Sequence, residues 1–133
     1  MPNNVSFLSP KSMHEPRGYS HTAKIGPGVL LFIAGQVALD RSGNLVGSGD
    51  FRAQSQQVFK NLQAAVEAAG GKFRDIVKLN VYTVDVSTLA DYREVRDHYI
   101  DVANPPTSTL IQVAALFRPD FMIEIEAVAV LQA

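Results

Sequence analysis

The sequence predicts an α+β fold in which two helices lie on one face of a mixed β-sheet. Two observations support this class. Apolar residues recur at helical spacing in residues 51–69 and 89–99. Apolar and polar residues alternate at strand spacing in residues 75–86 and 121–131. The predicted order of elements is β-β-(β)-α-β-α-β-β, which places the strands in one sheet with the helices against it.

Length and composition are typical of one globular domain, which we expect to span residues 1–133. Hydrophobic residues make up 47% of the chain and charged residues 19%, and no repeat or mid-chain linker interrupts the sequence. Residues 1–18 are polar and contain three prolines, which predicts an extended N-terminal arm.

Charge and cysteine content exclude several kinds of protein. Twelve basic and thirteen acidic residues leave a net charge of −1 and form no basic run, which argues against a nucleic-acid partner. The absence of cysteine excludes disulfides, thiolate metal sites and a cysteine nucleophile. The longest strongly apolar run, Val29–Ala34, is too short to cross a bilayer, and residues 1–20 lack a signal-peptide pattern. We therefore expect a cytoplasmic protein without a membrane partner.

Glycine and proline mark the turns of the N-terminal half. Residues 21–35 are predicted to form a β-hairpin whose turn is Gly26-Pro27-Gly28. Residues 40–47, with the sequence DRSGNLVG, predict a second turn and a short strand.

Both helices carry recognisable ends. Asp50 is the expected N-cap of the first helix and Gly70-Gly71 its end, while Ser87 or Thr88 would cap the second. The predicted buried stripe of the first helix is Phe51, Val58, Leu62, Ala65, Val66 and Ala69. That of the second is Leu89, Tyr92, Val95 and Tyr99.

Three strands follow in the C-terminal half. Residues 75–86 alternate, and the expected faces are Val77, Leu79 and Val81 on one side and Lys78, Asn80 and Tyr82 on the other. The next strand is predicted at Thr109–Ala115 and the last at Phe121–Leu131.

The last strand has two dissimilar faces. One face would carry Phe121, Ile123, Ile125, Ala127, Ala129 and Leu131. The other would carry Met122, Glu124, Glu126, Val128 and Val130. Because helices cover only one side of the sheet, the apolar part of the second face needs another chain to bury it. We predict a homo-oligomer whose sheets face each other, with Glu124 near a cleft between subunits.

Five segments together resemble the RidA/YjgF family of reactive-intermediate deaminases. They are GYSHTAKIG, LFIAGQVALD, DFRAQSQQVFKNLQAAVEAAGG, DIVKLNVYTVD and the closing IEIEAVAV, in register from about Gly18 to Val130. The resemblance implies a chorismate-mutase-like fold and a homotrimer with clefts between subunits. It also implies hydrolysis of small 2-imino acids, or their enamine tautomers, to 2-keto acids and ammonia without a metal or organic cofactor.

The resemblance also assigns site residues. Tyr19 matches a tyrosine that lines the cleft, and Gly35 and Gln36 match the pair that closes a strand against the site. Glu124 matches the carboxylate that holds or activates the attacking water. We therefore expect Glu124 and Tyr19 to be the catalytic residues.

Three positions depart from the deaminase pattern. In the segment NPPTST, Thr107 stands where active deaminases have an arginine that grips the substrate carboxylate, while Ala34 replaces a serine and Arg96 an asparagine. A hydrogen bond to a neutral hydroxyl contributes about 0.5–1.5 kcal/mol, against roughly 1.5–3 kcal/mol for one to a charged group. We expect weaker carboxylate binding at Thr107 and an altered substrate class.

Three arginines could compensate. Arg96 is the first candidate as a substrate-binding residue, although a surface arginine paired with Glu94 or Asp97 is the interpretation we favour. Arg17 lies in the arm, and Arg118 could simply bind Asp120.

Other catalytic arrangements find little support. His21 and His98 are too isolated for a metal site, and no acid–base pair of histidines is apparent. Ser108 has no His–Asp pair beside it.

Two functions remain. The first is a hydrolase of a small imine or enamine, in which Glu124 holds water while the Thr107 hydroxyl and the Thr109 backbone N–H fix the substrate. The second is a non-catalytic trimer that binds a small metabolite in the cleft between subunits. The sequence does not name the ligand.

Overall fold

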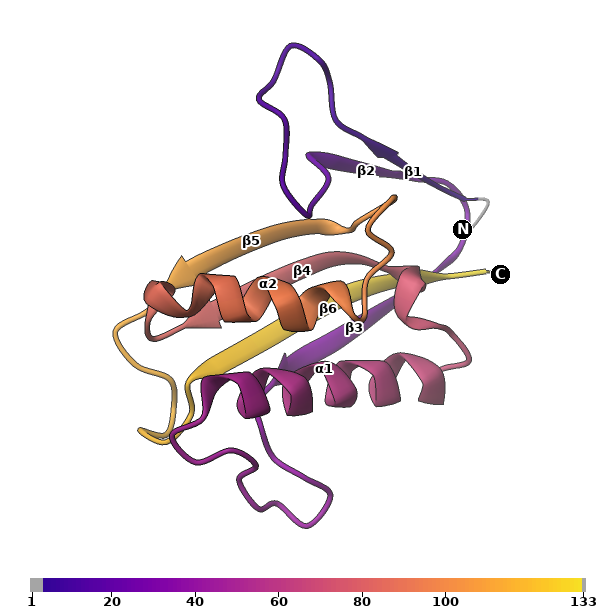
Figure 1. Ribbon diagram of the computed structural model, residues 1–133. Helices are drawn as coiled ribbons and strands as arrows, with labels where there is room; N and C mark the ends of the chain where they lie inside the picture. Colours follow the sequence, from indigo (N-terminus) through magenta and orange to yellow (C-terminus); the bar gives the residue numbers. More distant parts are fainter. Residues whose placement is uncertain (1–3, 133) are drawn as a thin grey trace.

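The computed structural model describes residues 4–132. Figure 1 shows one face of a β-sheet covered by two helices, beside a smaller two-stranded sheet. The strands are β1 Val5–Leu8, β2 Thr22–Ile25, β3 Val29–Gln36, β4 Ile76–Thr83, β5 Thr107–Gln112 and β6 Ile123–Leu131, and the helices are α1 Phe51–Ala68 and α2 Leu89–Asp97. Two short 3-10 turns, Phe73–Asp75 and Val86–Thr88, precede β4 and α2.

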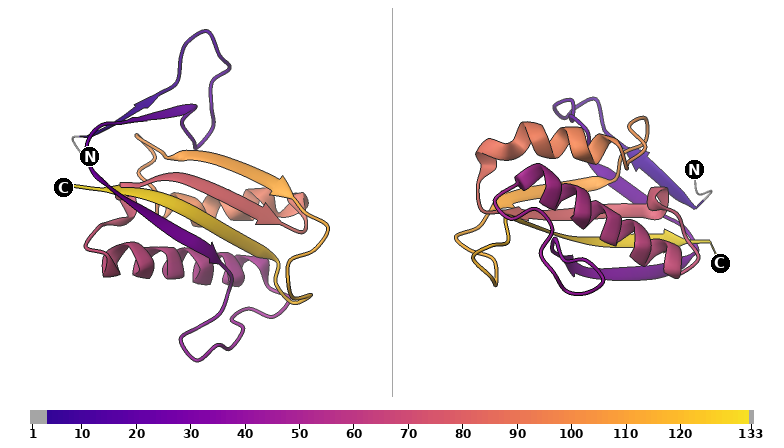
Figure 2. Two further views of the ribbon diagram at one scale, coloured as in Figure 1. Left: turned by 180° about the vertical axis from the view of Figure 1, so that it is seen from behind. Right: turned by 60° about the horizontal axis from the view of Figure 1, so that its bottom comes forward.

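The main sheet has the order β3-β6-β4-β5. The β4–β5 pair is parallel, whereas β6 runs antiparallel to both β3 and β4. Figure 2 shows from two further directions that α1 and α2 lie on the same side of this sheet. The predicted mixed α+β architecture is therefore confirmed.

Helix α1 follows the sequence signals closely. Asp50 is its N-cap and accepts a hydrogen bond from the Ala53 backbone N–H at 3.1 Å. The helix ends before Gly70, whose φ of +89° suits glycine. Phe51, Val58, Leu62 and Val66 are buried and Ala65 packs against the core. Ala69 is the exception, because it lies at the exposed C-cap.

Helix α2 is short and starts at one of the two predicted caps. Thr88 occupies the N-cap, but its side chain makes no capping bond. Asp85 instead accepts a bond from the Ser87 N–H and starts the preceding 3-10 turn. Tyr92 and Val95 are buried as expected, whereas Leu89 and Tyr99 are only partly buried against the core.

The predicted hairpin over residues 21–35 is wrong. β2 pairs with β1, from Val5 opposite Ile25 to Leu8 opposite Thr22, so the N-terminal arm itself contains a strand. β3 pairs with β6 in the main sheet. The bend at Gly26–Gly28 carries the chain from one sheet to the other. Glycine suits residue 28, because a Cβ atom there would lie only 2.8 Å from the Leu131 carbonyl oxygen.

Smaller differences concern strand limits and one face. β5 begins at Thr107, two residues earlier than predicted, and residues 40–47 form a turn with only an isolated bridge between Leu39 and Leu45. A register shift between Ile76 and Lys78 separates Val77 from Leu79 and Val81. Val77 therefore packs with Val5 and Val130 in a second apolar cluster, away from the main core.

β6 has the predicted faces. Ile123, Ile125, Ala127 and Ala129 are buried in the main core. On the open face β1 covers Val130, but Leu30 and Phe32 of β3 remain 55% and 75% exposed. The contact with a second copy of the chain is predicted from the open face of β6. This exposure on the neighbouring strand β3 agrees with it, and the contact stays a prediction.

Candidate functional site

The segment after the arm lies against the start of β5. The Ser20 hydroxyl donates to the Pro105 carbonyl oxygen at 2.6 Å, and the Ser20 N–H donates to the Pro106 carbonyl oxygen at 3.0 Å. These bonds fasten Tyr19 beside the stiff NPPTST segment. A hollow of about 550 Å³ opens there, lined by residues 19–23 together with Lys78, Leu79 and residues 107–109. The structure thus brings Tyr19, Thr107 and Thr109 together.

Thr107 is not free to donate to a ligand. Its hydroxyl donates to the Val77 carbonyl oxygen at 2.9 Å, which leaves only its lone pairs for a ligand. A substrate carboxylate needs donors, and a hydroxyl whose proton is already shared cannot supply one. The Thr107 hydroxyl is therefore poorly placed to donate to a carboxylate, and its expected role in fixing a polar group of the substrate stays a prediction.

Two histidines surround Tyr19. The Tyr19 hydroxyl lies 2.9 Å from His14 Nε2, and His21 Nε2 lies 2.8 Å from the His14 carbonyl oxygen. The His14 and His21 rings meet edge to face with centroids 4.7 Å apart. No pattern in the sequence predicts this pair, because an irregular loop joins the two histidines. Tyr19 therefore has a hydrogen-bond partner that is itself able to exchange a proton.

Glu124 lies at another place on the sheet, over Gly35. A Cβ atom on residue 35 would overlap the Glu124 carboxylate, so glycine leaves room for that side chain. Gln36 pairs with Ile125 across the β3–β6 ladder, and its side-chain amide donates to the Ala34 carbonyl oxygen at 3.1 Å. Burial, and second the charge of Glu126, raise the pKa of Glu124.

Glu126 lies on the same face of β6, and its pKa is shifted in the opposite direction to that of Glu124. Its Oε1 accepts hydrogen bonds from Asn80 Nδ2 at 3.0 Å and from the Tyr82 hydroxyl at 2.8 Å. These bonds lower the pKa of Glu126, and the bond to Glu126 raises the pKa of Tyr82. Two neighbouring carboxylates with pKa values displaced in opposite directions suit different roles, one able to carry a proton and one held ionised.

Within one chain Glu124 does not lie beside Tyr19 and Thr107. Glu124 is opposite Tyr82 on β4, whereas Thr107 is opposite Lys78. Four residues of β4 separate these positions, or about 13 Å at the usual strand rise of about 3.3 Å per residue. Tyr19 and Glu124 can therefore act on one small ligand only if two copies of the chain contribute.

The three candidate arginines have other partners or positions. Arg96 is buried, with its guanidinium against Gly18 and 2.9 Å from Asp97 Oδ1. The favoured pairing with Asp97 is thus confirmed, but the expected surface position is wrong because the arm covers the side chain. Arg118 pairs with Asp120 at 2.6 Å, as expected. Arg17 is exposed on the arm and does not line the hollow beside Tyr19.

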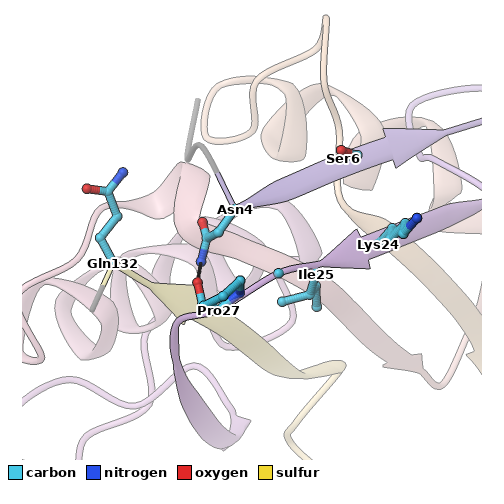
Figure 3. Close-up of a pocket in the computed structure, with 7 residues that line it drawn as sticks. Asn4, Ser6, Lys24, Ile25, Pro27 and Gln132 are labelled. Atoms are coloured by element: carbon cyan, nitrogen blue, oxygen red, sulfur yellow. Dashed lines mark hydrogen bonds between the residues drawn. The ribbon is translucent and has the colours of Figure 1, made fainter.

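A further hollow of about 570 Å³ lies on the small sheet. Figure 3 shows Asn4 and Lys24 at its edge, with Asn4 Nδ2 donating to the Pro27 carbonyl oxygen at 2.8 Å. None of the expected site residues lines it. Over residues 4–132, no three histidine or carboxylate side chains converge in a way that could hold a metal ion. No helix in this described part is long and apolar enough to span a membrane.

Comparison with known proteins places the chain in a family. A profile described as "Endoribonuclease L-PSP" matches residues 11–131, which is most of the sequence. The chain belongs to the RidA/YjgF family. Among RidA/YjgF relatives, a RutC family protein of Pyrococcus horikoshii is 37% identical over 84% of this chain and 85% of its own.

Two other relatives inform the fold and the chemistry of this RidA/YjgF protein. The crystal structure of the Rid family protein YyfB from Yersinia pestis has a TM-score of 0.86, with 36% identity over 96% of this chain and 99% of that one. A Dermatophagoides farinae protein named 2-iminobutanoate/2-iminopropanoate deaminase is 30% identical over 86% of both chains.

Proposed function

We propose that the protein hydrolyses a small imine or enamine in a cleft shared by two copies of the chain. The observation that carries this proposal is the setting of Glu124, a partly shielded carboxylate over Gly35 whose pKa is raised. The relative named as an imine deaminase supplies the reaction class.

The chemistry follows from these groups. Water adds to the carbon of the protonated imine while Glu124 takes one of the water protons, giving a neutral tetrahedral carbinolamine. That proton then passes to the carbinolamine nitrogen, the C–N bond breaks and ammonia leaves, and the ionised Glu124 takes the hydroxyl proton as the carbonyl forms. A partly shielded carboxylate with a raised pKa is suited to these steps, because it can both accept and return a proton. Tyr19, whose hydroxyl is hydrogen-bonded to His14, would face the substrate from the other copy.

The departure at Thr107 bears on the substrate. Because the Thr107 proton is shared with Val77, this position offers no donor where deaminases of the family have an arginine. We therefore propose a substrate class different from that of 2-aminoacrylate-type imines bound through a guanidinium.

The test is turnover of 2-iminopropanoate generated in solution, followed as pyruvate release. We expect Glu124→Gln to lose the enzyme-dependent rate and the exposed control Glu67→Gln to keep it. Thr107→Arg should raise the rate if the missing cation limits activity. A rate at background in the unsubstituted protein removes this substrate from the proposal.

The shared cleft has its own test. Tyr19→Phe and Glu124→Gln chains, each with reduced activity, are unfolded together and refolded as a mixture. Some clefts then combine an intact Tyr19 from one copy with an intact Glu124 from the other, so part of the activity should return. No recovery in a mixture shown to contain both chains in one oligomer contradicts the shared site.

The second candidate is a trimer that binds a small metabolite without turnover. The absent arginine at position 107 favours it, since binding sites that do no chemistry have no need of a fixed carboxylate geometry. Glu124→Gln should then leave ligand affinity unchanged.

A further inference from the structure

A small anionic ligand in the hollow beside Tyr19 needs a cation. The hydroxyl of Thr107 shares its proton with Val77, and Thr109 is a neutral residue on the edge strand. Arg96 is enclosed under Gly18, and Arg118 is paired with Asp120. None of the arginines considered above supplies the charge.

Lys78 lies where that charge is missing. It is paired in register with Thr107 across the parallel β4–β5 ladder, and residues paired in this way project from the same face of a sheet. Its neighbours Val77 and Leu79 are buried, whereas Lys78 itself is exposed. It lines the hollow beside Tyr19 and also a second one, of about 450 Å³, beside Phe32 and Glu126.

No carboxylate neutralises this lysine. Within residues 4–132, Lys78 Nζ has no carboxylate oxygen within 4.0 Å, although the charge of Lys78 is close enough to help lower the pKa of Glu126. Glu126 already accepts two hydrogen bonds, from Asn80 and Tyr82. Lys78 is therefore a mobile ammonium on a long stem, next to the position of the missing arginine and open to the same hollow.

We propose that Lys78 binds the carboxylate of the substrate in the hollow formed with Tyr19 and Thr107. This inference rests on the proposed function and adds a substrate-binding residue to it, an ammonium that holds the substrate carboxylate in place of a guanidinium. An ammonium is a point charge without the planar fork of arginine, so it holds a carboxylate with less fixed orientation. The substrates should accordingly be carboxylates whose position in the cleft differs from that set by an arginine at residue 107.

The test measures binding without turnover. Calorimetric titration of the full chain uses 2-oxobutanoate, the ketone product of 2-iminobutanoate, and its uncharged amide as the matched probe. Lys78→Met removes the charge and keeps most of the stem, Lys78→Arg keeps the charge, and Lys60→Met, an exposed site on α1, is the control. A charged hydrogen bond predicts 2-oxobutanoate affinity reduced by roughly 10- to 150-fold in Lys78→Met. Lys78→Arg and Lys60→Met should bind within a few-fold of the unsubstituted protein.

Three results overturn the inference: no measurable 2-oxobutanoate binding by the unsubstituted protein, equal affinity in Lys78→Met, or an equal loss of amide binding in that variant. Hydrolysis assays on the same variants separate this inference from the proposed function. Turnover of 2-iminobutanoate with an unchanged KM in Lys78→Met refutes the role of Lys78 and leaves the hydrolase standing. Lys78-dependent binding without turnover in any variant refutes the hydrolase and leaves the anion site standing.

Discussion

Gln54 connects helix α1 to the segment that leads into β6, and its loss should be costly. Its side chain is fully buried. Its amide donates to the carbonyl oxygens of Gly47 at 3.1 Å and Asp120 at 2.9 Å, and its own oxygen accepts from the Met122 N–H at 2.9 Å. A leucine of similar size removes all three bonds. At about 0.5–1.5 kcal/mol each, their loss amounts to about 1.5–4.5 kcal/mol of unfolding free energy.

Urea unfolding at one fixed protein concentration is the assay, since an oligomer unfolds in a concentration-dependent way. A loss near 3 kcal/mol lowers the urea midpoint by about 2 M for a slope of about 1.5 kcal/mol/M. The exposed neighbour Gln56→Leu is the matched control and should change stability by less than about 0.5 kcal/mol. A Gln54→Leu protein that unfolds with the midpoint of the unsubstituted chain refutes the reasoning that these bonds stabilise the start of β6.

Two further predictions concern Glu124 and the arm. Because the folded pKa of Glu124 is raised, its protonated form favours folding, and that contribution is lost as pH rises through the folded value. The glutamine in Glu124→Gln cannot ionise, so the stability of this variant relative to the unsubstituted protein should increase between about pH 3.5 and about pH 7. Urea unfolding measures this difference, and a decrease over that range contradicts a raised pKa for Glu124. Gly18→Ala combines a φ of +78° with a Cβ atom that would overlap the Arg96 guanidinium, so residues 9–17 should be cleaved faster by limited proteolysis. Gly43→Ala is the control, because residue 43 also has a positive φ but an added Cβ atom there meets no neighbouring atom. If residues 9–17 are cleaved equally fast in Gly18→Ala and Gly43→Ala, the contact with Arg96 is unimportant.

Periodicity in the sequence predicted the parts of the fold in which burial dominates. Helix α1 has its apolar stripe, its Asp50 cap and its glycine end within one segment, and β6 alternates over its whole length. β1 could not be found this way, because four residues in a polar arm are too few to show alternation. Because the sequence does not predict β1, the hairpin prediction pairs β2 with β3 instead. The displacement of Val77 depends on a local register shift, which leaves no mark in a pattern of apolar residues.

The site was less accessible to sequence reasoning than the fold. The resemblance named Tyr19, Gly35 and Glu124, but their separation along β4 is a property of strand register. Lys78 was visible as one of three polar residues on a face of β4, yet only its pairing with Thr107 sets it beside the missing arginine. The contact of His14 with Tyr19 depends on the path of an irregular loop, for which no spacing rule exists.

The anchoring of Ser20 to the proline segment has a consequence for how this protein could change over time. β1 and β2 hold one end of the intervening loop, and Ser20 holds the other. Lengthening an exposed loop between fixed ends adds only a small entropic cost, about 0.6 kcal/mol for each doubling. Insertions or substitutions around residues 10–13 could thus alter what lies above the hollow while Tyr19 keeps its position. The loop is a natural place for selection, or for a protein engineer, to graft new recognition onto an unchanged reaction centre.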